Sequence, residues 1–156
     1  DENNYAWNIN LCDEDIEIII KTGGLIGISM DQRILGVPSK KKNRKGINNV
    51  RAIFNSIYQI VEAANLSTQL TPQQKNETWN YLAFGSDFEG LINPIDSYPT
   101  ALSYQKLHDD LIEHLNNELE QGTNLYGLNS KVDIETVVHK ISYNNAADFV
   151  IKHYPL

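Results

Sequence analysis

Apolar residues recur at helical spacing near the start of the chain and then give way to a short apolar run. Residues 13–22 carry an isoleucine stripe and end at two consecutive glycines, which predicts a helix that stops at a left-handed capping residue. Residues 25–30 are apolar and too few for a helix, so we expect a buried strand there, followed by Asp31. Residues 47–64 return to helical spacing and predict a long amphipathic helix.

The middle of the chain predicts a short helix and a second strand. Thr71 is followed at once by proline and, three residues on, by glutamine, which is the pattern of a capping box with proline in the first turn. A short helix should run from there towards Trp79. Residues 81–84 are mostly apolar and predict a buried strand that brings Asp87 to its carboxyl end.

The last third of the chain predicts three helices. A loop with two prolines leads to Ser103, the expected N-cap of a helix that carries leucine at every fourth position and ends at Gly122. Two further helices are expected at residues 134–141 and 145–153.

Two apolar strands joined by a long helix predict a parallel βαβ unit. Parallel strands need neighbours at both edges and helices over both faces, and a closed barrel needs eight of them. The chain of 156 residues supplies two convincing strands. We therefore expect an α/β fold in which residues 1–156 are a single segment, the C-terminal part of a larger (β/α)₈ TIM-type barrel. Such a piece exposes strand edges, so its partners should be the rest of its own barrel or a second copy.

Composition narrows the range of partners. The chain has 20 acidic and 13 basic residues and a formal charge of −7, which argues against general nucleic-acid binding because that needs a basic surface. No apolar run is long enough to predict a membrane-spanning helix. Cys12 is the only cysteine, so an internal disulfide is impossible. The chain shows no signal peptide and begins without methionine, so we expect a processed or excised chain, of unknown localisation.

Candidate catalytic and substrate-binding residues follow the carboxyl ends of both predicted strands. A carboxylate at the carboxyl end of a barrel strand is held rigidly and is open to substrate, which makes Asp87 the catalytic candidate. Asp31 and Arg33 follow the other strand on the same barrel face, and a guanidinium suits a substrate carboxylate, so both are substrate-binding candidates with Glu89. The alternatives are that Asp87 caps a turn and that Arg33 pairs with Asp31 or Asp87 for structure.

Five segments of the sequence, taken in order, resemble one family. They are NLCDEDI at residues 10–16, GGLIGI at 23–28, FGSDFEG at 84–90, SYP at 97–99 with Leu107, and KISYNNAA at 140–147. Together they resemble the C-terminal portion of the renal (membrane) dipeptidase family, within the amidohydrolase-type metal-dependent barrels. FGSDFEG is similar to the family's G-[GS]-D-F-D-G motif at the eighth barrel strand.

This resemblance implies a (β/α)₈ barrel that hydrolyses a small peptide or a related amide with a pair of zinc ions. It also implies that Asp87 carries the proton from water to the leaving amine, or holds the amino group of the substrate. Glu89 stands where the family motif has a second aspartate, and Ile9 stands where a substrate-binding arginine is expected.

The family's metal ligands are missing from this sequence. They are an H-x-D motif, a glutamate and two histidines, whereas this chain has no H-x-D ahead of Asp87 and all four of its histidines follow Asp87. We therefore assign no metal ligand here, expect zinc only in a longer parent protein, and expect the isolated chain to be inactive. The alternative is a non-catalytic barrel relative that acts as a ligand-binding or structural module.

Two other patterns in the sequence do not predict a functional site. His108 and His114 are six residues apart and fall on different faces of their helix, and the pair Asp110 and His114 arises by chance on an acidic helix. The lysine-rich stretch at residues 40–45 reads as a solvated loop, because the net charge of the chain is negative.

Overall fold

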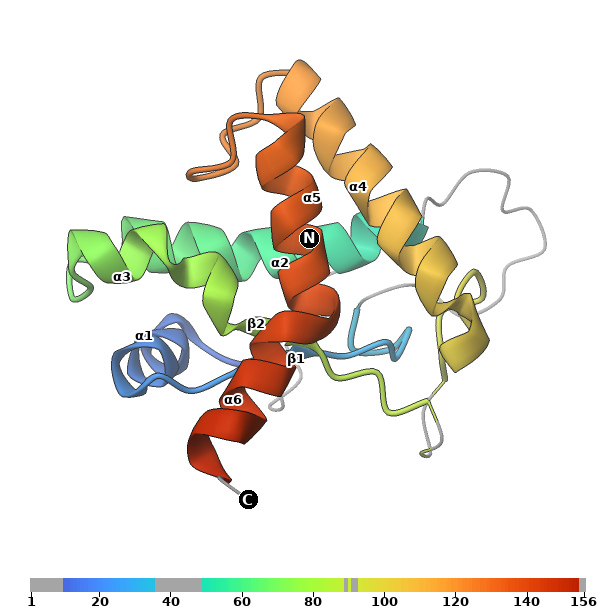
Figure 1. The fold of residues 1–156 in the computed structure, drawn as a ribbon, viewed down its shortest axis with the longest axis horizontal. Coiled ribbons are helices and arrows are strands. Elements are labelled where there is room, and N and C mark those ends of the chain that lie inside the picture. The colour runs from blue at the N-terminus through green and yellow to red at the C-terminus, as the bar shows by residue number, and fades with distance from the viewer. Residues whose placement is uncertain (1–9, 36–48, 89, 91–92, 155–156) are drawn as a thin grey trace.

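The computed structural model describes residues 10–35, 49–88, 90 and 93–154, which form a mixed α/β structure that is mostly helical (Figure 1). The elements run in the order α1 (Asp13–Thr22), β1 (Ile26–Ile28), α2 (Asn49–Leu66), α3 (Pro72–Asn76), η1 (Thr78–Tyr81), β2 (Leu82–Phe84), η2 (Ala101–Ser103), α4 (Tyr104–Glu120), α5 (Lys131–His139), η3 (Lys140–Asn144) and α6 (Asn145–His153). Here η1 and η2 are 3₁₀ turns and η3 is a π-helical turn. None of the described helices is long and apolar enough to cross a membrane.

The two strands form the parallel pair that the sequence predicts. Ile26 of β1 lies opposite Leu82 of β2, and α2 is part of the connection between the strands. Beyond the pair, Gly85 donates its N–H to the carbonyl of Ile28 over 3.0 Å. A Cβ at Gly85 would lie 3.2 Å from the Cα of Gly27, so two glycines allow the strands to approach closely here.

The core lies where the long helices meet. α2 packs against α1 and α4, α4 packs against α5, and η3 and α6 pack against β2 (Figure 1). Side chains with 1% exposure or less come from α1, α2, β2, α4, α5 and η3: Ile20, Ile53, Ile57, Leu82, Leu107, Leu111, Ile134 and Ile141. The apolar stripes read from the sequence are therefore the faces that the helices bury.

Two helix boundaries predicted from capping residues, the end of α1 and the start of α3, are confirmed. Gly23 ends α1 in the left-handed conformation with φ +71°, and Gly24 donates its N–H to the carbonyl of Ile19 over 2.8 Å. Thr71 and Gln74 form the expected capping box at α3.

Several boundaries differ from the prediction for local reasons. β1 stops at Ile28 instead of residue 30, because Met30 turns to a new partner and accepts the N–H of Ile95 over 3.1 Å. β2 begins at Leu82, since residue 81 closes the 3₁₀ turn η1. Ser103 makes no side-chain cap for α4, because it belongs to the preceding turn η2.

Some predictions fall on residues that lie outside the described part of the chain. These are Ile9, Glu89, the lysine-rich stretch 40–45, and residues 47–48 at the start of the predicted second helix. The described part of that helix, α2, continues to Leu66, two residues beyond the predicted end.

Candidate functional site

Asp87 lies on an exposed turn just after β2. Its backbone has φ +53°, in the left-handed region that few residues other than glycine adopt. Its carbonyl accepts the N–H of Gly90 over 2.9 Å, and a Cβ at Gly90 would lie 2.2 Å from Oδ1 of Asp87. The glycine that closes the motif therefore leaves room for the aspartate carboxylate.

Asp31 is buried and is held by Arg33. The Asp31 carboxylate lies 2.5 Å from Nη2 of Arg33 and also accepts the backbone N–H groups of Arg33 (2.8 Å) and Asn93 (3.3 Å). The side-chain hydrogen bonds from Arg33 are the largest cause that lowers the pKa of Asp31 to about 2. Of the sequence alternatives for Arg33, the structure places it in the pair with Asp31, although 52% of its side chain stays exposed.

Gln32 joins the loop after β1 to the loop after β2, a role that sequence reasoning missed. It is 4% exposed, and its Nε2 donates to the carbonyl of Pro94 (2.6 Å) and to Oδ1 of Asp96 (2.9 Å). Its backbone N–H donates to the carbonyl of Asn93 over 2.8 Å. The sequence signal for this role is the polar run that directly follows an apolar strand. It does not identify the partners of Gln32, because they lie more than 60 positions away in the chain.

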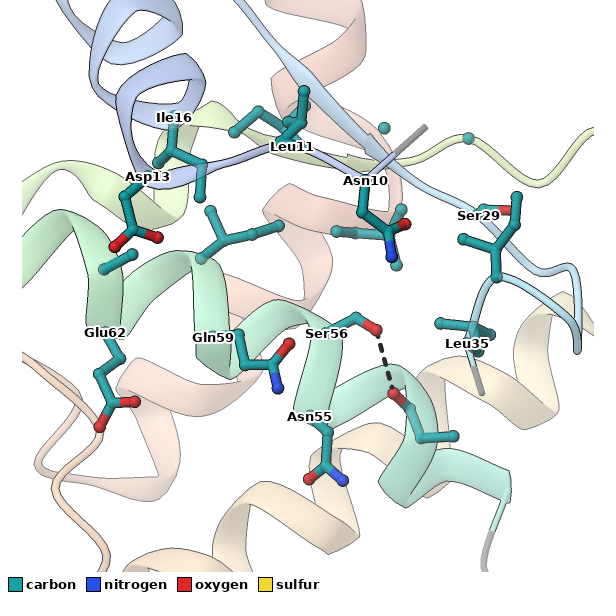
Figure 2. Close-up of a pocket in the computed structure, with 18 of the residues that line it drawn as sticks. Asn10, Leu11, Asp13, Ile16, Ser29, Leu35, Asn55, Ser56, Gln59 and Glu62 are labelled. Carbon is teal, nitrogen blue, oxygen red and sulfur yellow. Dashed lines mark hydrogen bonds between the residues drawn. The ribbon is translucent and has the colours of Figure 1, made fainter. Parts of the chain in front are cut away.

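A cavity of about 940 Å³ lies between the start of α1, β1 and α2 (Figure 2). Asp87 lines it, whereas Asp31 and Arg33 do not. Its apolar lining includes Leu11, Ile16, Ile26, Ile28, Ile34, Leu35, Ile60 and Leu66. Its polar lining includes Asn10, Ser29, Asn55, Ser56 and Gln59.

The cavity has one sign of charge. Asp13, Glu62 and Asp87 line it, and no lysine, arginine or histidine does so among the described residues. Figure 2 draws Asp13 of α1 and Glu62 of α2 on the same side of the cavity, with Leu35 on the opposite side. The site is therefore suited to a cationic group on the side with the two acids.

The described residues do not fit a zinc pair. No group of three or more histidine, cysteine, aspartate or glutamate side chains among them is placed to hold a metal ion. Asp110 instead accepts the hydroxyl of Tyr98 over 2.6 Å and pairs with Lys106, while His114 faces Glu118 at 3.7 Å. The Asp110 carboxylate is therefore engaged by Tyr98 and Lys106, whereas the buried Nε2 of His114 has no hydrogen-bond partner among the described residues.

Asn145 fixes the strand that leads to Asp87, and this role was not read from the sequence. The side chain is buried, and its Nδ2 donates to the carbonyls of Trp79 (2.9 Å) and Leu82 (2.8 Å). The π-helical turn η3 precedes it, within an otherwise continuous run of helix from α5 to α6. Asn145 thus connects this helical run to the start of β2.

Comparisons with known proteins identify no family for this chain. No family model matches it, and no curated protein or solved structure matches it either. The resemblance to the dipeptidase family therefore stays a prediction that rests on the short motifs and on the arrangement of the residues described above.

Proposed function

We propose that this chain is the C-terminal portion of a zinc-dependent, dipeptidase-like amidohydrolase with a (β/α)₈ barrel. The observation that carries the proposal is the parallel β1–α2–β2 unit whose second strand leads directly to the exposed carboxylate of Asp87. Both loops that carry candidate residues follow the carboxyl ends of parallel strands, which is where barrel enzymes place their active sites.

In this proposal Asp87 is the residue that acts on the reacting atoms. Its carboxylate either carries the proton from water to the leaving amine or holds the amino group of the peptide substrate. Asp87 lines the cavity, and Gly90, which has no side chain, leaves room for its carboxylate. The rest of the parent protein supplies the zinc ligands.

Arg33 is the proposed partner of the substrate carboxylate, with Asp31 as its positioning residue. The Asp31 carboxylate accepts hydrogen bonds from one edge of the guanidinium, and the exposed half of the arginine side chain remains available to a ligand. Glu89, two positions after Asp87 in the sequence, is proposed to contribute to substrate binding.

Complementation tests the proposal. The chain is co-expressed with the N-terminal part of a renal dipeptidase that carries H-x-D, the glutamate and both histidines, and dipeptide hydrolysis is measured. We expect hydrolysis from the pair and none from either part alone. Asp87→Asn should lower the rate by at least about 10²-fold, since that is the low end for losing a general acid–base group.

Controls separate the outcomes of this experiment. Asp148→Asn changes an exposed aspartate on α6 and should leave the rate unchanged. The chain alone, incubated with zinc and passed through gel filtration, should retain less than about a tenth of an equivalent of metal. Equal hydrolysis by the wild-type and Asp87→Asn pairs contradicts the catalytic role, and tight dipeptide binding without hydrolysis favours the non-catalytic alternative.

A further inference from the structure

Two short segments that follow the strands are joined to each other by hydrogen bonds. They are residues 30–33, after β1, and residues 93–96, after β2. Asn93 connects them twice, because its carbonyl accepts the N–H of Gln32 over 2.8 Å and its own N–H donates to Oδ2 of Asp31 over 3.3 Å. The segment after β2 is therefore one of the supports of the Asp31 carboxylate.

The side chain of Gln32 strengthens this junction from the inside. It is 4% exposed, and its Nε2 donates to the carbonyl of Pro94 (2.6 Å) and to Oδ1 of Asp96 (2.9 Å). The two acceptors match the two N–H groups of the amide, and both belong to segment 93–96. Because a buried polar group that loses its partner is costly, this amide holds the two segments together.

The junction ends at the guanidinium of Arg33. Asp31 is 1% exposed, and its carboxylate accepts hydrogen bonds from Nε (3.0 Å) and Nη2 (2.5 Å) of Arg33. Nη1 takes no part in this pair, so the guanidinium keeps a second edge for another carboxylate. Binding through two parallel N–H groups requires that the plane of the guanidinium is fixed in the right orientation. That orientation depends on Asp31 and hence on segment 93–96.

We propose that Gln32 is a second positioning residue for the substrate-binding Arg33. Its buried amide holds segment 93–96 against Asp31, and Asp31 then holds the guanidinium in the orientation that meets the substrate carboxylate. Gln32 itself touches no substrate. Asp87 takes no part in this junction, so loss of the Gln32 amide should weaken substrate binding and spare turnover. The inference rests on the proposed role of Arg33, but its first test needs no hydrolysis.

Nuclear magnetic resonance of the complete chain tests the positioning directly. The Nε–H of Arg33 donates to Asp31, so its signal should exchange slowly with water in the wild type. Gln32→Met removes both donors at nearly constant side-chain volume and should speed this exchange at least about tenfold. Gln105→Met is the matched control, because the exposed Gln105 also donates to an aspartate over 2.9 Å. This control should leave the exchange at Arg33 unchanged.

Substitutions at positions 32 and 96 test the contact between the segments. Gln32→Glu places a carboxylate against Asp96 and should speed the exchange at Arg33 more than Gln32→Met does. Adding Asp96→Asn supplies a donor that faces this carboxylate, so slow exchange should return in part. Asp96→Ala removes one of the two acceptors at an exposed position and should speed the exchange less than Gln32→Met does. It keeps the test decisive if Gln32→Met folds poorly.

Kinetics of the complemented enzyme tests the consequence for substrate binding. Gln32→Met should raise KM for a dipeptide about tenfold and leave kcat within about twofold, because only binding of the substrate carboxylate is weakened. A dipeptide amide has no free carboxylate for Arg33 to bind. The wild-type and Gln32→Met pairs should therefore hydrolyse the amide at the same rate.

Three results overturn the positioning inference. They are unchanged exchange at Arg33 in Gln32→Met, no recovery when Asp96→Asn is added to Gln32→Glu, and an unchanged KM in an active complemented pair. Absence of hydrolysis by the wild-type pair instead contradicts the proposed function. The exchange measurements on the chain alone then still decide whether Gln32 positions Arg33, so the two failures are distinguishable.

Discussion

Replacing Asn145 with leucine should destabilise the protein, because this side chain satisfies two backbone carbonyls in the interior. Asn145 is 8% exposed, and its Nδ2 donates over 2.9 Å to Trp79 and 2.8 Å to Leu82. Leucine has a similar size but no donor. The substitution therefore removes both hydrogen bonds and leaves two carbonyl oxygens buried without a partner.

The magnitude follows from the cost of unsatisfied groups. A buried polar group that loses its partner costs about 1–3 kcal/mol, so two carbonyls that share one amide nitrogen should lower the free energy of unfolding by about 2–4 kcal/mol. Domains of this kind are stable by about 5–15 kcal/mol, so the loss is a large fraction of the total. The loop that carries Asp87 follows β2 directly, so it should also lose protection from hydrogen exchange.

Urea unfolding measures the effect. The midpoint should fall for Asn145→Leu while the slope against urea stays constant, which is the signature of a change in stability alone. Asn117→Leu, at an exposed position of α4, is the matched control and should change stability by no more than about 0.5 kcal/mol. A loss of less than about 0.5 kcal/mol for Asn145→Leu as well would refute the assigned anchoring role.

Two ionisable groups predict how the stability of the protein depends on pH. An ion pair lowers the pKa of Asp31, and burial lowers the pKa of His114. Arg33 holds the pKa of Asp31 down to about 2, so this carboxylate contributes stability above about pH 4 that is lost as the pH falls towards 2. Urea unfolding midpoints measured at a series of pH values should show the loss, of the order of 2 kcal/mol, and Arg33→Gln should reduce it. If the midpoints of Arg33→Gln fall between about pH 4 and pH 2 as much as those of the wild type, the pairing is contradicted. Burial lowers the pKa of His114, which lies edge-on to Phe54 at 4.8 Å and near Glu118, with Arg51 also opposing its charge. Above about pH 6.5 His114 is neutral in both the folded and the unfolded protein, so it does not change the free energy of unfolding. Below that value the unfolded protein binds the proton more readily, so stability should fall. His114→Leu should flatten this part of the pH profile, and an equally steep profile would show that another group titrates.

Local sequence determined where the helices and strands lie and where several of them begin or end. The stripe of α1, the glycine that caps it and the capping box at Thr71 depend on residues within a few positions of one another, so spacing alone predicted them. The parallel βαβ order also followed from the alternation of apolar strands with a long helix. The exposed turn of Asp87 after β2 agrees with its predicted place at a strand end.

Only the tertiary structure decided the partners of polar side chains. Gln32 meets Asp96, Arg33 is occupied by Asp31, and Asn145 reaches back to Leu82 across 63 positions. The first and third of these contacts join residues far apart in sequence, and no local pattern distinguishes a buried donor from a solvated one. The open cavity beside β1 arises in the same way, because residues of α1, β1 and α2 come to line it only after these elements pack together.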